Sequence, residues 1–356
     1  MKPGFRLFLA VLAISFSVPA QTDRATQAPP AQQNAGGQAI IIRTENVIVP
    51  VTVKDKSGQL VAGLQKEDFR VFADGIEQKI IGFSASTVPL SAVVLVDDDL
   101  EEKQAASVQS SLSVISASFG PSDEVAVVAY DQFPRTVFDF SFNNDALFTQ
   151  LKRLELSSHQ AGVNGGPTNN PGSTGPIVNG VALPNGRGLP EHGSGRYKKE
   201  TSLNDALFSA ADMLKTRGRD RRKIVFLVSD TTNKGNRHTF EETLHSLNIN
   251  DIAVYSISVV HTLPVGKRFV QGGAADVDRY AASTGGDTFY ASKQDDLERL
   301  YSEVTEQARN EYTLTFSPQD VDRAKDYHPI EVRVRRPNLD ILTRQGYYQS
   351  AIAAGH

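Results

Sequence analysis

The pattern of hydrophobic positions divides the chain into three parts. Between 39 and 84 apolar residues alternate with polar ones, and the turn-forming pair Asp74-Gly75 separates two such runs, which predicts short antiparallel strands. From 88 to 310 continuous apolar runs alternate with segments of helical period. This pattern predicts a parallel sheet with helices on its faces. From 311 to 350 the alternating β pattern returns.

The individual elements follow from these runs. Strands are predicted in the central part at 92–96, 124–130, 136–140, 223–229 and 252–260, and helices at 103–119, 144–156, 202–215, 239–249, 275–283 and 294–310. The outer parts add strands at 47–53, 69–72, 79–83, 311–316, 330–335 and 341–348. The fold class is therefore α/β, with a doubly wound, mostly parallel sheet. We expect the N- and C-terminal strands to pack together as one small β module, because neither set has enough strands to bury a core alone.

Three stretches lack such a pattern. Residues 1–20 combine Lys2 and Arg6 with a short apolar core and a small-residue end, which is typical of a secretory signal peptide. Residues 21–38 are rich in Gln, Ala, Pro and Gly and predict a disordered linker. Residues 158–200 are dominated by Gly, Asn, Pro and Ser and are too long for an ordinary connection. They form either a lid over the sheet edge or an inert insertion.

Composition narrows the function classes. The 356 residues include no cysteine, which excludes disulfides, thiolate metal sites, thiol catalysis and a lipidated-cysteine anchor. The formal net charge is −4, and removal of the leader takes away two further basic residues, so a general nucleic-acid binder is not expected. No later stretch has the length of apolar sequence that a transmembrane helix needs. We therefore expect an exported protein, periplasmic or secreted.

The first central strand ends in an acidic cluster. Five of the six residues from 97 to 102 are Asp or Glu, and they directly follow the apolar run 92–96. Parallel α/β sheets place their binding groups at the carboxyl ends of such strands. Because so many carboxylates repel one another unless a cation, a basic partner or solvent compensates them, the cluster predicts a metal or ligand position. A solvated acidic turn that caps the next helix is the alternative.

Six separated stretches carry a family resemblance. They are VTVKDKSG at 51–58 with EDF at 67–69 and Asp74-Gly75, SDEVAVV at 122–128, TSLNDAL at 201–207, KIVFLVSD at 223–230, STGG at 283–286 and RNEYTL at 309–314. Their order and spacing resemble the von Willebrand factor type A domain, in the exported bacterial form that short β segments flank. The likeness covers nearly the whole chain after the leader and implies a domain over 88–310.

The resemblance implies a metal-ion-dependent adhesion site at the carboxyl edge of the sheet. Family members carry Asp-x-Ser-x-Ser after the first strand, a Thr before a helix and an Asp after the fourth strand. Asp97, Thr201 and Asp230 match this pattern, whereas Asp99 and Glu101 replace the two serines. These five residues form the predicted metal or ligand site.

The replacement of hydroxyls by carboxylates changes what the site can hold. Around one divalent cation, the four carboxylates of the set leave a charge of about −2, which repels an acidic ligand. Either calcium, which accepts many carboxylates more readily than magnesium, is held as a structural ion, or no metal is bound and the acidic cup receives a Lys or Arg of a protein partner. Asp98 and Glu102 are expected to be outer charges, and Asp131 is expected to flank the same edge.

Two enzyme classes share part of this pattern. A receiver domain has a similar acidic pocket, but the expected export and the long separation of Asp131 from Lys293 count against it. A haloacid-dehalogenase-type phosphatase would use Asp97 as nucleophile and Asp99 as general acid beside a metal. That family expects Thr or Val in the place of Glu101. We therefore predict a non-enzymatic, exported protein-binding module of the adhesion type.

Overall fold

The computed structural model of the chain describes residues 46–159, 177–178, 181–182, 201–218, 220–259, 272–291, 294–322 and 324–349. All of them belong to one unit that runs from Thr44 onward. The predicted signal peptide and linker, at 1–20 and 21–38, lie outside the described residues, as does nearly all of the 158–200 stretch.

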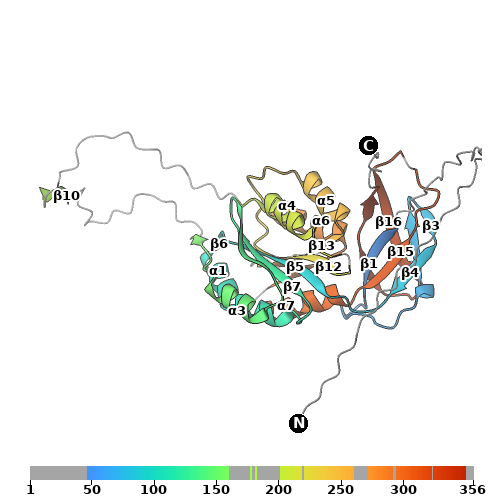
Figure 1. Ribbon diagram of the computed structural model, residues 1–356, viewed down its shortest axis with the longest axis horizontal. Helices are drawn as coiled ribbons and strands as arrows, with labels where there is room; N and C mark the ends of the chain where they lie inside the picture. The colour runs from blue at the N-terminus through green and yellow to red at the C-terminus, as the bar shows by residue number, and fades with distance from the viewer. Residues whose placement is uncertain are drawn as a thin grey trace, which may run out of the picture. The chain divides into compact units, whose positions relative to one another are not determined.

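Six strands form the central sheet, in the order β14-β13-β12-β5-β7-β8 (Figure 1). Neighbouring strands are parallel except for β7 and β8, which are antiparallel. The chain moves outward from the middle in both directions, so the strand order reverses between β5 and β12. The strands are β5 (Leu90–Asp97), β7 (Glu124–Tyr130), β8 (Pro134–Ser141), β12 (Arg222–Ser229), β13 (Ile252–Ser258) and β14 (Thr288–Tyr290). The predicted α/β class with a parallel sheet is confirmed.

Helices pack on both faces of this sheet (Figure 1). One face carries α1 (Glu102–Ser111), α2 (Ile115–Ser118), α3 (Asn144–Arg153) and α7 (Gln294–Arg309), and the other carries α4 (Leu203–Leu214), α5 (Phe240–Ile249) and α6 (Gly272–Thr284). The helix predicted at 103–119 is interrupted by a 3-10 turn at Leu112–Val114. The Ser111 hydroxyl bonds back to the carbonyls of Ser107 and Val108, an interaction that bends helices.

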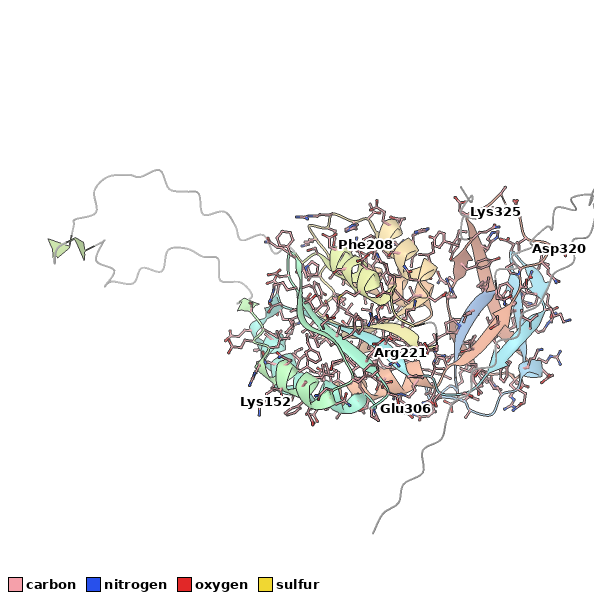
Figure 2. All side chains as sticks on the ribbon, viewed as in Figure 1. Lys152, Phe208, Arg221, Glu306, Asp320 and Lys325 are labelled. Carbon is pink, nitrogen blue, oxygen red and sulfur yellow. The ribbon has the colours of Figure 1, made fainter. Side chains whose placement is uncertain are left out.

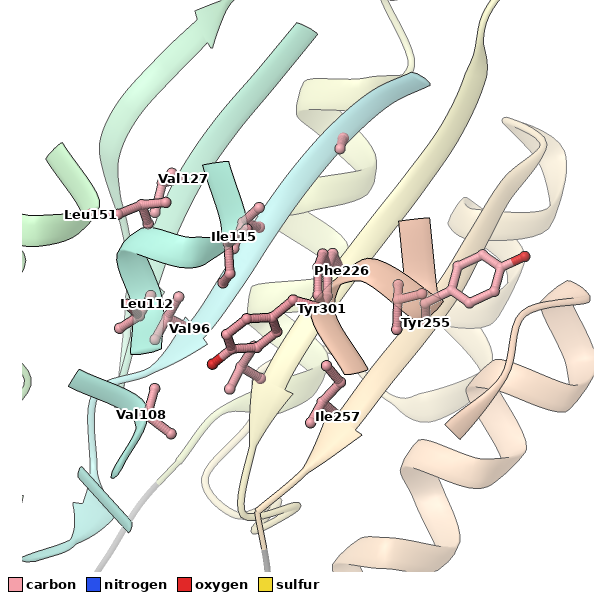
Figure 3. Close-up of a cluster of buried hydrophobic side chains, with 14 of the residues drawn as sticks. Val96, Val108, Leu112, Ile115, Val127, Leu151, Phe226, Tyr255, Ile257 and Tyr301 are labelled. Carbon is pink, nitrogen blue, oxygen red and sulfur yellow. The ribbon is translucent and has the colours of Figure 1, made fainter. Parts of the chain in front are cut away.

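Side chains along the central strands alternate between the two helical layers. In β5, Val94 and Val96 pack with α1 and α7, whereas Val93 and Leu95 pack with α4. Every residue of β5 is buried, because helices cover both faces. Figure 3 shows the first layer, in which the rings of Phe226 and Tyr301 meet edge to face at 5.9 Å. The alternation fixes the face on which each strand-end residue lies.

Two further sheets combine strands from the two ends of the described chain, in the orders β17-β1-β15-β4 and β18-β16-β2-β3. Their neighbouring strands are antiparallel, and they share a core in which the rings of Phe69 and Tyr312 lie 5.2 Å apart. The strands are β1 (Val47–Lys54), β2 (Phe69–Ala73), β3 (Ile76–Gln78), β4 (Ile80–Ser84), β15 (Tyr312–Phe316), β16 (Tyr327–Val334), β17 (Asp340–Thr343) and β18 (Gly346–Tyr348).

The strand predicted at 341–348 is divided between these two sheets, as β17 and β18. The division occurs at Arg344, whose guanidinium turns into the interior and bonds to the carbonyls of Gly346 and Asn248 and to the Asp251 carboxylate. The described residues also form a 3-10 turn at Lys66–Asp68 and two short strand pairs. These pairs are β6 (Leu100–Glu101) with β9 (Ser158–His159) and β10 (Ile177–Val178) with β11 (Val181–Ala182).

Gly285 and Gly286 end α6, as the sequence predicts. Gly285 has a φ of +84°, in the left-handed region that favours glycine. A Cβ on Gly286 would lie 1.9 Å from the Val254 carbonyl oxygen of β13. This close backbone approach brings the chain back to the sheet just before β14.

We predict that Gly286→Ala lowers the free energy of unfolding by about 2 kcal/mol or more, because the strand backbone must move to admit the methyl group. Urea denaturation measures this change. Gly120→Ala is the control, because a Cβ on Gly120 would lie 3.5 Å from its nearest atom, a carboxylate oxygen of Asp123, which is an ordinary van der Waals distance. Equal effects of the two substitutions would contradict the close packing of Gly286.

Candidate functional site at the carboxyl edge of the central sheet

Three adjacent strands bring a row of polar side chains to one level of the sheet. Tyr130, the last residue of β7, is in register with Asp97, the last residue of β5. Val228 of β12 is in register with Val96, so Ser229 follows beside Asp97. Because successive side chains along a strand point to opposite faces, Tyr130, Asp97 and Ser229 all lie on the face of the sheet that α4 covers. The row stands where the strand order reverses, which is the place where open α/β sheets bind ligands.

Asp97 is the centre of this row. Its side chain is fully buried, one carboxylate oxygen accepts a hydrogen bond from the Ser229 hydroxyl at 2.9 Å, and the other accepts from the backbone N–H of Asp99 at 3.0 Å. Ser229 in turn accepts from the backbone N–H of Thr231 at 2.9 Å. A buried carboxylate is costly unless such partners surround it. Asp97 is therefore fixed in one orientation.

Asp99 and Thr201 extend the site toward solvent. The Thr201 hydroxyl donates to an Asp99 carboxylate oxygen at 3.4 Å, and Thr201 is buried whereas Asp99 is partly exposed. Thr201 lies at the entry to α4, where its carbonyl accepts from the Lys234 N–H at 2.9 Å and the next residue, Ser202, donates its own N–H to the Asp131 carbonyl at 2.9 Å. The structure thus brings together Asp97, Asp99 and Thr201.

Asp230 follows β12 directly, and Glu101 is the last residue of β6, immediately before α1. One Asp230 carboxylate oxygen accepts from the backbone N–H of Thr232 at 2.8 Å, and the intervening Thr231 has a φ of +68°, which is rare for a β-branched residue. The Glu101 side chain caps α1, where it accepts from the backbone N–H of Gln104. The membership of Asp230 and Glu101 in the site stays a prediction.

The prediction that Asp98 is an outer charge is wrong. Asp98 is 3% exposed, forms an ion pair with Arg135 of β8 and accepts from the backbone N–H of Ser157 at 2.6 Å. Because successive side chains alternate, Asp98 points away from the Asp97 row, and Arg135 compensates its charge there. Glu102 is exposed, and Asp131 is partly exposed beside the entry to α4.

Tyr130 is a site residue that sequence reasoning missed. Its side chain is fully buried, and its hydroxyl has no hydrogen-bond partner of ordinary length among the described residues. Burial raises the pKa of Tyr130 well above its usual value, the carboxylates of Asp97 and Asp230 raise it further, and the Ser229 hydroxyl offsets part of the rise. Tyr130 therefore belongs to the row that Asp97 and Ser229 form. An unpaired buried hydroxyl costs about 1–3 kcal/mol.

The oxygen atoms at this edge are of two kinds. Asp97 and Asp99 contribute carboxylates, and Thr201 and Ser229 contribute hydroxyls. Across the described ranges, no group of three or more His, Cys, Asp or Glu side chains is arranged to hold a metal ion. A cation here would therefore use hydroxyl oxygens as well as carboxylates, and such hard donors suit calcium or magnesium.

The geometry also bears on the two enzyme classes. A phosphatase of the haloacid-dehalogenase type would need Asp97 to be accessible as a nucleophile. Asp97 has no exposed surface, and both its carboxylate oxygens accept hydrogen bonds, so this arrangement does not suit attack on a phosphoester. Lys293, the candidate switch lysine of a receiver domain, lies outside the described residues.

The turn that carries Asp230 is anchored by Asp205 of α4. The Asp205 carboxylate accepts from the backbone N–H groups of Arg237 at 3.0 Å and His238 at 2.8 Å, and it also lies 2.8 Å from Nδ1 of His238. The His238 ring stacks on Phe208, which Figure 2 labels, with ring centroids 3.9 Å apart. These contacts hold the 231–238 segment against α4.

Comparisons with known proteins give a likeness of fold. No family model matches the sequence, and no curated protein matches it. Similar solved structures include a von Willebrand factor type A protein from Catenulispora acidiphila, with 8% identity, a TM-score of 0.43 and coverage of 87% of this chain and 76% of that one. Another is the conserved hypothetical protein BatB from Bacteroides thetaiotaomicron, with 10% identity, a TM-score of 0.40 and coverage of 62% and 98%.

A third is proximal thread matrix protein 1 from the mussel byssus, whose metal-ion-dependent adhesion motif is described as occupied by zinc. It has 14% identity, a TM-score of 0.42 and coverage of 66% of this chain and 49% of the mussel chain, so the match spans about half of that protein. One of these three neighbours is named as a von Willebrand factor type A protein, the family that the sequence resembles. At such identities and TM-scores, nothing about what this chain binds follows from them.

The helices give one further finding. None of those that the structure describes is long and apolar enough to cross a membrane.

Asp205 gives a pH-dependent prediction. Burial raises its pKa, but the hydrogen bonds from His238 and Arg237 outweigh burial, so the pKa lies below the ordinary value of 3.8. The stabilisation is therefore complete above pH 3.8 and is lost as the pH falls through the lowered pKa. We expect Asp205→Asn to cost about 2 kcal/mol at pH 7 and progressively less below pH 3.8.

Urea denaturation of both proteins across this pH range measures the difference. Asp212→Asn, an exposed substitution on the same helix, is the control and should change stability little. A cost of Asp205→Asn that is the same at pH 7 and pH 3 would show that the carboxylate charge does not anchor the turn.

Proposed function

We propose that the chain is an exported protein-binding module of the adhesion type, built on a doubly wound α/β unit. Its binding site is the carboxyl edge of the central sheet, formed by Asp97, Asp99, Glu101, Thr201 and Asp230, and it holds a divalent cation. The observation that carries this proposal is the buried Asp97 carboxylate, in a row of oxygen donors at the reversal of strand order.

The donor set favours calcium over magnesium. Two carboxylates, those of Asp97 and Asp99, stand beside the hydroxyls of Thr201 and Ser229. Calcium accepts six to eight oxygens of mixed type in loose geometry, whereas magnesium requires near-ideal octahedral geometry and keeps several waters. Asp99 and Asp230 are partly exposed, whereas Asp97 is buried.

The charge of the edge favours a basic partner. The carboxylates of Asp97 and Asp99 together balance the charge of one divalent cation, and those of Asp230 and Glu101 add negative charge at the rim. A partner that presents a Lys or Arg side chain is attracted to this rim, whereas an acidic side chain is repelled. The partner is therefore a protein that binds through a basic residue, beside the cation or, if none is present, in its place.

Calorimetric titration with calcium and with magnesium tests the site. We expect calcium to bind the wild-type protein more tightly than magnesium, and Asp97→Asn or Asp230→Ala to weaken calcium binding about 10- to 100-fold. Asp326→Asn, an exposed substitution just before β16, serves as the control and should bind like the wild type.

Wild-type protein that binds neither cation would overturn the cation site. A basic peptide that then binds the wild type but not Asp97→Asn would leave the acidic cup as the site. Hydrolysis of a generic phosphoester with magnesium, abolished by Asp97→Asn, would replace the binding function with phosphatase activity.

We further propose that the strands at 39–84 and 311–350 fold as one β unit beside the α/β domain at 88–310. The pairing supports this, because β1 has β15 and β17 as neighbours and β2 pairs with β16. Loss of the C-terminal strands would expose both edges of β1. Limited proteolysis should therefore give no stable fragment that keeps the N-terminal strands and lacks 311–350, and recovery of one would contradict a shared unit.

A further inference from the structure

Tyr130 differs from the other fully buried tyrosines of the described chain. The hydroxyl of Tyr255 donates to Glu311, that of Tyr280 donates to Asn204 at 3.0 Å, and that of Tyr301 lies 2.9 Å from the Ser111 hydroxyl. The Tyr130 hydroxyl is equally buried and interacts with the Ser229 hydroxyl, but no described group meets it with ordinary hydrogen-bond geometry. Folded proteins rarely leave a buried hydroxyl unpaired unless an ion, a water or a functional role accounts for it.

The position of Tyr130 associates this hydroxyl with the candidate site. Tyr130 stands in register with Asp97 across the β5-β7 pair, and its ring packs in the core layer under α4. The charges of Asp97 and Asp230 both act on its hydroxyl, and Ser229 lies beside it. Core packing therefore holds this hydroxyl at the level of Asp97, beside Ser229.

We propose that Tyr130 is an additional ligand residue of the cation site, whose hydroxyl oxygen supplies a neutral donor to a cation held at Asp97. This inference rests on the proposed function and deepens it. A phenol oxygen has lone pairs and one proton, so the oxygen can face a cation while the proton is donated to a neighbouring carboxylate. Tyr130 thereby supplies from β7 a neutral oxygen of the kind that Asp99 and Glu101 no longer supply from the turn after β5.

The substitution Tyr130→Phe separates this role from a structural one. Without a cation, removal of an unpaired buried hydroxyl should raise the melting temperature, by roughly 2 °C. With calcium, the variant should bind about 10- to 100-fold more weakly and so gain a smaller increase in melting temperature. The substitution therefore raises stability in chelator and lowers the stabilisation by calcium.

The experiment is thermal unfolding of the full chain in chelator and across a calcium titration, for the wild type, Tyr130→Phe and Tyr301→Phe. Tyr301→Phe is the matched control, because its hydroxyl is paired with Ser111 on the opposite face of the sheet. It should lower the melting temperature in both conditions and keep the wild-type calcium shift. This outcome together with the expected behaviour of Tyr130→Phe supports the proposal.

Three results would overturn it, and they are distinguishable. A lower melting temperature of Tyr130→Phe in chelator would show that its hydroxyl is paired within the protein. A full calcium shift in Tyr130→Phe would remove Tyr130 from the site while leaving the proposed function intact. The absence of a calcium shift in the wild type would remove both the cation site and the role of Tyr130.

Discussion

The parallel register of β7, β5 and β12 is the constraint on which the site depends. It places Tyr130, Asp97 and Ser229 at one level and on one face, although they are far apart in the sequence. Helices cover both faces of these strands, so the register cannot slip by one residue without moving charged and hydroxyl groups into the opposite apolar layer. The site is therefore specified by the core beneath it.

The two edges of the sheet use polar groups differently. At the amino edge, Arg221, labelled in Figure 2, donates to the Ser91 hydroxyl at 2.9 Å and to the Leu90 carbonyl, and it lies 3.4 Å from Glu124. Arg222, the first residue of β12, forms an ion pair at 3.2 Å with the buried Glu311, which immediately precedes β15. Burial raises the pKa of Glu311, and Arg222 and Tyr255 partly offset the rise. These contacts join the central sheet to neighbouring elements, whereas the polar groups of the carboxyl edge form the Asp97 row.

The sequence predicted best those elements whose residue pattern has a single cause, burial on both faces of the sheet. Continuous β-branched runs mark strands buried on both faces, so β5, β7 and β12 follow from the sequence alone. Strand β14 has three residues, too few to show a period, and the break between β17 and β18 depends on an arginine whose partners lie in other elements. Asp98 was misplaced because its partner Arg135 comes from another strand. Tyr130 was missed because a tyrosine at the end of an apolar run has the pattern of an ordinary core residue, and only the register places its hydroxyl beside Asp97.

Terbium luminescence tests the central claim, that the Asp97 row binds a cation beside Tyr130, most directly. Terbium occupies calcium sites and emits when a nearby aromatic side chain transfers excitation to it, and this chain has no tryptophan, so tyrosine must be the donor. The account predicts tyrosine-sensitised emission from the wild type that calcium displaces, its loss in Asp97→Asn and a strong reduction in Tyr130→Phe. Emission of undiminished strength from Tyr130→Phe, or none from the wild type, would contradict it.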